Sequence, residues 1–362
     1  MCEGMMRVGF FIVERILAGF VGWLTRMLGV LVALAWSPAQ ADFTIATRNI
    51  AWLRNQPLSA ADYQRCKSHN RESRAALDER DPARWICRTA DHYARLGAIA
   101  REVNADVFAF QEVEGEQALA RILPAHEYAF YVPDSPWIQR VGFAVRKDRI
   151  TVRRASAYLP LGAMMGKRSR SGADLEISIN GKPPRLLAVH LKSACHARPL
   201  TDETRHPRDD GSEVSACIQL GKQVKPLKEW IDAREHEGMH FLILGDFNRR
   251  FDGVPETTGP ARDQFGRQLG FWRELAEGHR GGLVRLTAGH EQLRSCWGGD
   301  PKLPANERAM FIDQIVADHA LAERVVPGSV RQFALHDGKI TREVRAALRE
   351  LSDHCPLSVR IR

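Results

Sequence analysis

The stretch Phe-Leu-Ile-Leu-Gly-Asp-Phe-Asn at residues 241–248 predicts a buried β-strand that ends in polar side chains. Its first four residues are all apolar and are followed by Gly245, as in a strand covered on both faces. Asp246 and Asn248 lie two residues apart, so an extended chain would present both on the same side. Oxygen ligands at a strand end suit Mg²⁺ and a phosphate group. The alternative is an Asx turn that only closes the strand.

Strand and helix signals alternate along the rest of the chain. Apolar or alternating stretches predict strands at residues 43–49, 106–110, 128–132, 141–146, 152–159, 174–179, 185–191, 310–317, 330–334 and 357–361. Helical spacing predicts helices over residues 91–103 and 114–123, and another that carries Leu220, Val224, Leu227 and Ile231. Asn-Gly at 180–181 predicts a hairpin turn, whereas residues 54–91 are polar and irregular. No repeat or linker divides residues 42–362, which are expected to form one domain.

The N-terminal segment predicts export. Residues 27–36 form an apolar run that follows three Arg residues, and Ala-Gln-Ala at 39–41 matches a cleavage pattern before Asp42. We interpret residues 1–41 as a signal peptide and expect a periplasmic or secreted protein without stable membrane insertion. The alternative is an uncleaved anchor over residues 16–36, which would span a bilayer only at a penalty because it contains an Arg.

The composition is that of a basic globular protein. The 362 residues are 44% hydrophobic and 27% charged, with a formal net charge of +8. The leader carries three Arg and two Glu, so its removal lowers this charge to +7. A basic exported protein is attracted to polyanions such as nucleic acid, anionic lipid or lipopolysaccharide, and net charge alone does not distinguish them.

Cysteine usage agrees with export. Beyond the leader the chain has six Cys, and an even number in an exported protein favours disulfides. Two pairs bracket polar stretches, so we predict Cys66–Cys87 and Cys195–Cys217; each would contribute about 3 kcal/mol by closing a loop of about twenty residues. Cys296 and Cys355 remain as the third pair. The sequence has no C-x-x-C spacing of the kind that indicates a zinc site.

Polar residues at strand ends form six motifs in a fixed order. They are Thr-Arg-Asn-Ile at 47–50, Gln-Glu-Val at 111–113, Val-His-Leu-Lys-Ser at 189–193, Gly-Asp-Phe-Asn at 245–248, Ile-Asp-Gln-Ile-Val at 312–316 and Ser-Asp-His-Cys-Pro at 352–356. In this order the chain resembles the endonuclease/exonuclease/phosphatase superfamily, which includes DNase I, exonuclease III and neutral sphingomyelinases, in an exported bacterial branch. The resemblance implies a four-layer α-β-β-α sandwich, the DNase I-like fold. Two mixed sheets would face each other between flanking helices, with the active site at one edge.

The resemblance also implies Mg²⁺-dependent hydrolysis of a phosphoester, with Mn²⁺ or Ca²⁺ as alternative ions. The residue chemistry fits, because a bound Mg²⁺ polarises a phosphoryl oxygen and offsets charge in the transition state. Glu112 would be the main ligand of the ion. Asn49 and Asp353 would lie in or near its coordination shell.

The remaining motif residues fit catalytic roles. His354 would take a proton from the attacking water, and Asp313 would hold its ring in the required tautomer. Asp313 would otherwise be a costly buried charge in mid-strand. Asp246 would also orient the water. Asn248 and His190 would donate hydrogen bonds to the phosphate, and His190 would protonate the leaving oxygen if it acts as in DNase I-like relatives.

Phosphate contacts need basic or amide side chains near the site. Arg170 falls where many relatives keep a phosphate-binding Arg, and Arg249 directly follows the Asp-x-Asn motif. Gln139 or Arg140 would replace a Tyr of exonuclease III-type enzymes. The sequence also has Ala51 where those enzymes carry a carboxylate, which argues against abasic-site repair. The DNase I-type Arg after the ligand Glu is Glu114 here.

Three functions remain open. The favoured one is an exported, monomeric metal-dependent nuclease that cuts DNA, or RNA, with little sequence preference. The second is a phospholipid phosphodiesterase of sphingomyelinase type, for which residues 265–272 are the only candidate apolar loop. The third is a non-catalytic polyanion-binding protein on the same fold, although such a protein has no reason to keep clustered carboxylates.

Overall fold

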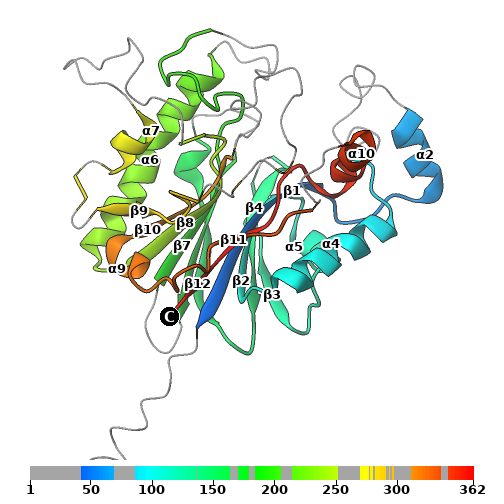
Figure 1. The fold of residues 1–362 in the computed structure, drawn as a ribbon, viewed down its shortest axis with the longest axis horizontal. Helices are drawn as coiled ribbons and strands as arrows, with labels where there is room; N and C mark the ends of the chain where they lie inside the picture. The colour runs from blue at the N-terminus through cyan, green and yellow to red at the C-terminus, as the bar shows by residue number, and fades with distance from the viewer. Residues whose placement is uncertain are drawn as a thin grey trace, which may run out of the picture. The chain divides into compact units, whose positions relative to one another are not determined.

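Two six-stranded sheets form the centre of the computed structural model (Figure 1). It describes residues 42–68, 86–135, 137–163, 170–178, 184–204, 214–251, 270–276, 278–279, 282–290, 293, 296, 311–335 and 341–362. The predicted signal peptide and the 180–181 turn lie outside the described residues. Residues from Phe43 to Arg362 belong to one compact unit.

The first sheet has the strand order β11-β12-β1-β2-β4-β3. Its strands are β1 (Phe43–Leu53), β2 (Val107–Val113), β3 (Tyr128–Tyr131), β4 (Arg140–Arg146), β11 (Arg331–Gln332) and β12 (Leu357–Ile361). β1 runs parallel to β2, with Asn49 opposite Gln111, and the register shifts before Leu53. Within that shift Ala51 has a φ of 50°, and Glu112 in β2 has a φ of 62°. Such irregularities re-aim side chains, here at the strand ends that carry Asn49 and Glu112.

The second sheet has the order β5-β6-β7-β8-β10-β9. Its strands are β5 (Thr151–Tyr158), β6 (Gly172–Ser178), β7 (Pro184–His190), β8 (His240–Asp246), β9 (Leu283–Arg285) and β10 (Asp313–Asp318). β7 is parallel to β8 with His190 opposite Asp246, and β10 is antiparallel to β8 with Asp313 opposite Asp246. Three predicted site residues therefore form one row across three neighbouring strands.

Alternation along the strands produces three apolar layers. Ile45 of β1 joins Leu244 of β8 and Ile315 of β10 in the core between the sheets, whereas Ala46 of β1 faces the outer cluster with Leu96. The outer face of the second sheet packs Ile243 of β8 against residues of the long helix α6, such as Leu227. The predicted four-layer sandwich is confirmed.

Helices cover both outer faces in Figure 1. They are α2 (Ala60–Ser68), α4 (Ala90–Val103), α5 (Glu116–Leu119), α6 (Ala216–His236), α7 (Phe271–Ala276), α9 (His319–Ala322) and α10 (Arg342–Leu351), with a 3-10 turn at Leu159–Leu161. α6 keeps Pro226 inside the helix and buries Leu220, Val224, Leu227 and Ile231, as expected. Among the described residues no helix combines the length and hydropathy needed to cross a bilayer.

Some predicted bounds were wrong. The helix expected over 114–123 is the short α5, because Gly115 delays its start and turns replace the helix after Leu119. Asp313 begins β10 rather than lying in mid-strand. The polar stretch 54–91 contains helix α2, whose buried Cys66 joins Cys87.

All three predicted Cys pairs lie at disulfide distance. The Cα–Cα separations are 5.8 Å for Cys66–Cys87, 4.9 Å for Cys195–Cys217 and 5.3 Å for Cys296–Cys355. Disulfides of this number fit an oxidising compartment.

Candidate active site

One amide side chain connects carboxylates that come from the two sheets. Asn49 Nδ2 donates to Glu112 Oε1 at 3.2 Å and to Asp246 Oδ2 at 3.0 Å. Its Oδ1 accepts a hydrogen bond from the backbone N–H of Ala51 at 2.9 Å. These hydrogen bonds show that Asn49 orients the two acids. Its role as a metal ligand stays a prediction.

His190 lies between the same two acids. Its Nε2 is 3.6 Å from Glu112 Oε1 and 3.5 Å from Asp246 Oδ2. The guanidinium of Arg170 contacts the same ring nitrogen and donates to Leu191 O at 3.2 Å. Burial, and then the charges of Arg170 and His354, lower the pKa of His190 well below its ordinary value, so the ring is neutral.

The end of β8 forms a turn around Asp246. Asn248 has a φ of 51°, and its backbone N–H donates to Asp246 Oδ1 at 2.7 Å. Asn248 Nδ2 donates to Leu191 O at 3.0 Å. The expectation of an extended chain through Asn248 was wrong, because the strand ends at Asp246. The Asx turn and the site occur together here.

Gly245 allows the close pairing that places Asp246. Its φ is 140°, and a Cβ at this position would overlap the carbonyl oxygen of Val189 on β7. Only glycine avoids both problems.

His354 and Asp313 form a hydrogen-bonded pair beside these acids. His354 Nδ1 lies 2.8 and 3.0 Å from the two carboxylate oxygens of Asp313. Its Nε2 is 3.7 Å from Asp246 Oδ2 and 3.9 Å from Asp353 Oδ1. Burial alone would lower the pKa of His354, but the charges of Asp313 and Asp246 raise it well above its ordinary value.

Ser352 joins this pair to the first sheet. Its hydroxyl donates to Asn49 O at 2.8 Å and accepts from the backbone N–H of His354 at 3.0 Å. The eight residues predicted to be catalytic or metal-binding thus come together: Asn49, Glu112, His190, Asp246, Asn248, Asp313, Asp353 and His354.

The donor set fits a hard divalent cation. Burial raises the pKa of Glu112 and of Asp246, although Arg170 opposes the shift at Glu112 and His354 opposes it at Asp246. Raised values mean that buried negative charge is incompletely offset, which a cation would correct. Glu112 would hold the ion together with Asp353, whose side chain is 52% exposed. Oxygen ligands of this kind suit Mg²⁺.

Two of the four predicted phosphate-binding side chains lie in the site. Arg170 contacts His190, and Gln139 hydrogen-bonds to Glu112, where it helps to lower that pKa. Gln139 also accepts from Trp137 Nε1 at 3.1 Å. Both positions are compatible with a phosphate contact.

The other two predicted side chains have different partners in the structure, so their phosphate contacts stay a prediction. Arg140 donates to Glu114 O at 3.1 Å and pairs with Asp134 at 3.3 Å. Arg249 is buried and donates to Cys195 O at 3.0 Å and to Arg198 O. These guanidiniums satisfy backbone carbonyls of loops, and the sequence contains no sign of that demand.

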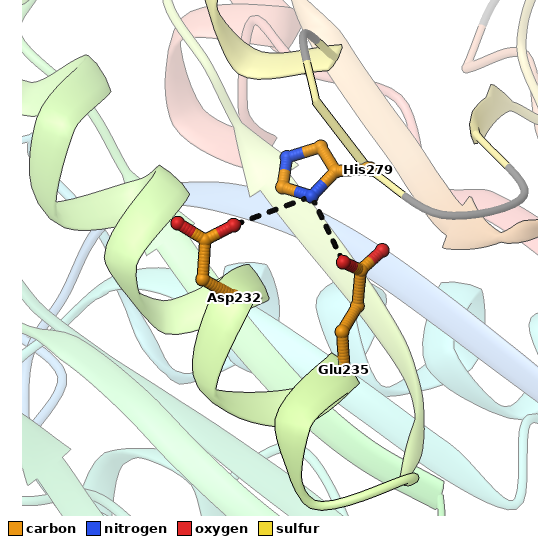
Figure 2. A group of neighbouring side chains, drawn as sticks. All are labelled: Asp232, Glu235 and His279. Atoms are coloured by element: carbon orange, nitrogen blue, oxygen red, sulfur yellow. Dashed lines mark ion pairs between the residues drawn. The ribbon is translucent and has the colours of Figure 1, made fainter.

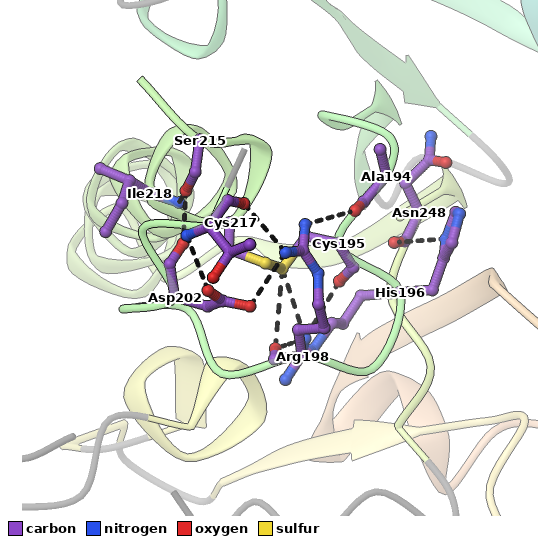
Figure 3. Close-up of a disulfide and its surroundings, with 11 residues drawn as sticks. Ala194, Cys195, His196, Arg198, Asp202, Ser215, Cys217, Ile218 and Asn248 are labelled. Carbon is purple, nitrogen blue, oxygen red and sulfur yellow. Dashed lines mark hydrogen bonds and ion pairs between the residues drawn. A yellow bond between two sulfur atoms is a disulfide. The ribbon is translucent and has the colours of Figure 1, made fainter. Parts of the chain in front are cut away.

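A disulfide loop supports the turn after β8 (Figure 3). Cys195 follows β7, and its bond to Cys217 ties this segment to the first turn of α6. His196 Nδ1 contacts Asn248 O at 3.1 Å. Arg198 donates to Ala194 O at 3.1 Å and pairs with Asp202 at 2.9 Å. The loop thus holds the backbone that carries Asn248.

Sequence reasoning missed Arg88. This buried side chain donates to Ile50 O at 2.8 Å, Leu351 O at 2.9 Å and Glu350 O at 2.6 Å. It thereby fixes the backbone just after Asn49 and just before Asp353. Only its position beside Cys87, in an otherwise polar stretch, could have indicated burial.

Comparisons with known proteins agree with this geometry. Residues 81–354 match the model of the Endonuclease/Exonuclease/phosphatase family. The chain belongs to this family. Its members are generally phosphoesterase hydrolases. No curated protein matches the sequence significantly.

Solved structures of this family have the same fold. Truncated TDP2 from Caenorhabditis elegans is 16% identical with a TM-score of 0.52, over 88% of this chain and 97% of that one. TDP2 from D. rerio, complexed with single strand DNA product, is 15% identical with a TM-score of 0.52, over 89% and 99%. At such identities the likeness concerns the fold alone.

Proposed function

We propose that this family member is an exported, Mg²⁺-dependent phosphodiesterase that hydrolyses DNA, and RNA as a further substrate, with little sequence preference. The observation that carries the proposal is the meeting of Glu112, Asn49 and Asp246 from both sheets beside the Asp313–His354 pair. A nucleophile-activating base, an orienting carboxylate and a cation-binding acid are the parts that phosphodiester hydrolysis needs.

The chain's own groups divide the reaction between them. When bound, the cation would supply electrostatic stabilisation of the phosphoryl oxygens from its place at Glu112 and Asp353. Asp313 accepts a hydrogen bond from His354 Nδ1, so Nε2 is the ring position that exchanges a proton with water. Because the pKa of His354 is raised, the ring acts as the base only after Nε2 has lost its proton, which the positive charge of a cation held at Glu112 would favour. Asp246, 3.7 Å from that nitrogen, orients the water and stabilises the imidazolium that forms.

Neutral His190 and Arg170 serve the phosphate. The lowered pKa of His190 argues against transfer of a proton to the leaving group. Because a guanidinium only donates, the neutral ring accepts from Arg170 at Nε2 and positions that cation for the phosphate. Arg170 adds a positive charge beside the ring. The net charge of +8 supports a polyanionic substrate. The D. rerio TDP2 structure is a complex with single strand DNA product, which favours DNA over the other candidate substrates.

We also propose that the protein is exported and monomeric. Three disulfides fit an oxidising compartment such as the periplasm or the outside of the cell.

The decisive experiment compares substrates with and without a chelator. Circular plasmid, linear DNA, RNA and sphingomyelin vesicles are each incubated with the wild type, Asp246→Asn and Glu323→Gln. Glu323 is an exposed carboxylate next to α9, so its variant is the matched control. We expect Mg²⁺-dependent plasmid cleavage that falls about 10²–10⁴-fold in Asp246→Asn and is unchanged in the control.

Other outcomes would replace the proposal. Release of phosphocholine from sphingomyelin without plasmid cleavage would identify a phospholipid phosphodiesterase. The described part of the candidate apolar loop gives that reading no support, since Phe271 is fully buried. Salt-sensitive DNA binding without turnover in Mg²⁺, Mn²⁺ or Ca²⁺ would identify a non-catalytic binder.

A further inference from the structure

A second group of metal-ligand side chains lies between α6 and the segment after α7 (Figure 2). Asp232 and Glu235 project from the last turns of α6, and His279 follows α7. His279 Nδ1 is 3.4 Å from Asp232 Oδ1 and 3.3 Å from Glu235 Oε2. Each residue thus turns one donor atom toward the same point.

The tautomer of His279 is fixed by a backbone contact. Its Nε2 lies 2.7 Å from Leu275 O, and a carbonyl can only accept, so this nitrogen carries the hydrogen. The imidazole side chain is 0% exposed. Among the described residues Nδ1 has no hydrogen-bond partner. Its lone pair therefore points from a buried ring at two carboxylate oxygens. A metal-ligating His in proteins is typically held by a backbone carbonyl in this way.

An ion pair between a protonated ring and the acids does not account for the distances. A charge-assisted N–H···O bond is about 2.7–2.9 Å long and directed at one oxygen. Here both distances exceed 3.2 Å, and the nitrogen is almost equally far from the two acids. A neutral nitrogen lone pair beside two carboxylates is repulsive unless a cation lies among them.

We propose that Asp232, Glu235 and His279 form a binding site for a divalent transition cation of the Zn²⁺ class. Zn²⁺ binds imidazole nitrogen and carboxylate oxygen at about 2.0–2.2 Å, so neighbouring ligand atoms in a tetrahedron lie about 3.3–3.6 Å apart. The two separations of 3.4 and 3.3 Å agree with such an edge. One nitrogen and two oxygens favour Zn²⁺ over Mg²⁺, which prefers oxygen alone.

The surroundings leave room for a fourth ligand. Asp232 is 54% exposed and Glu235 22%, so water reaches the side of the group opposite the buried ring. Lys228 Nζ lies 3.8 Å from Asp232 Oδ1, a solvent-exposed pair that a cation would displace at little cost. The bound ion would join His279 to α6. It therefore acts as a structural clamp on the outer layer of the second sheet.

The test measures Zn²⁺ binding without any substrate. The purified, disulfide-bonded chain is stripped with a chelator, returned to excess Mg²⁺ so that the oxygen site is occupied, and titrated calorimetrically with Zn²⁺. We expect one equivalent to bind to the wild type. Asp232→Asn and His279→Gln should lose at least about tenfold in affinity. Glu229→Gln, which removes an exposed carboxylate from the same helix, is the matched control and should bind as the wild type does.

A second readout is thermal stability. Zn²⁺ should raise the melting temperature of the wild type and of Glu229→Gln, but not that of Asp232→Asn, because ligands that bind only the folded state stabilise it. Asp232 is exposed, so its variant decides the matter even if His279→Gln does not fold. Absence of Zn²⁺ binding in the wild type, or equal affinity in Asp232→Asn and the control, would overturn the site. Neither result bears on plasmid cleavage.

Discussion

At the residue scale, the Asp313–His354 pair shows how the fold gives a side chain its chemistry. A lone His beside a strand has no defined tautomer. Here Asp313 binds Nδ1 at 2.8 Å, and the Ser352 hydroxyl fixes the backbone N–H of the same residue. The ring can therefore present only Nε2 toward Asp246.

The variant Asp313→Asn tests this positioning. An amide can bond Nδ1 with its oxygen or its nitrogen, so the tautomer is no longer fixed and the imidazolium loses its counter-charge. We expect kcat for plasmid cleavage to fall about 10²–10⁴-fold while KM changes little. Steady-state kinetics with far-UV circular dichroism as a folding check measure this. An unchanged kcat in a folded variant would remove Asp313 from the mechanism.

At the element scale, sequence patterns located strands better than helices. β12 occupies residues 357–361 as predicted, because an apolar strand with a buried face has a strong local signal. α10 was missed, since its first turns are rich in Arg and carry few large apolar residues. Its place is fixed instead by distant partners. Tyr63 of α2 and His92 of α4 both contact Glu350 at 2.9 Å.

Glu350 should make the docking of α10 depend on pH. Burial alone would raise its pKa, but hydrogen bonds from Lys67 and Tyr63 lower it overall. A carboxyl with a lowered folded-state pKa stabilises the protein above its unfolded pKa of about 4.3 and loses this effect as pH falls through the folded value. We expect Glu350→Gln to lower the free energy of unfolding by about 1–2 kcal/mol at pH 7. The difference from wild type should be smaller at pH 3 than at pH 7.

Urea unfolding at the two pH values measures this difference. Glu323→Gln, whose side chain is 70% exposed in the wild type, is the control and should match it throughout. A loss of equal size at pH 7 and pH 3 would show that Glu350 acts through packing and not through its charge.

At the scale of the whole molecule, the site depends on contacts that no local pattern reveals. The strand ends that carry Asn49, Glu112, Asp246 and His354 were identifiable from motifs in a known order. The residues that hold these strand ends in place could not be identified from the sequence. Arg88 and Arg249 bind backbone carbonyls that only the tertiary fold brings near them. Arg249 directly follows the site motif in the sequence, but its guanidinium donates to carbonyls of the 195–198 loop.

Comparing variants that lack one disulfide or the other distinguishes an effect on global stability from an effect on the site. Cys66–Cys87 and Cys195–Cys217 enclose loops of nearly equal length, with sequence separations of 21 and 22. Chain entropy therefore predicts similar losses, about 3 kcal/mol each, for the two double Cys→Ser variants. Among the described residues of the two loops, His196 of the second one contacts the turn that carries Asn248, at 3.1 Å from Asn248 O.

We therefore expect both double variants to lower the melting temperature by similar amounts, measured by calorimetry. Under conditions where both remain folded, Cys195→Ser/Cys217→Ser should also lose at least about tenfold in plasmid cleavage, because a group misplaced by about 1 Å loses most of its catalytic effect. Cys66→Ser/Cys87→Ser should lose less activity, because its link to the site runs through the backbone contacts of the adjacent Arg88, which the variant retains. Equal activity in the two variants would mean that the turn after β8 holds Asn248 without the loop.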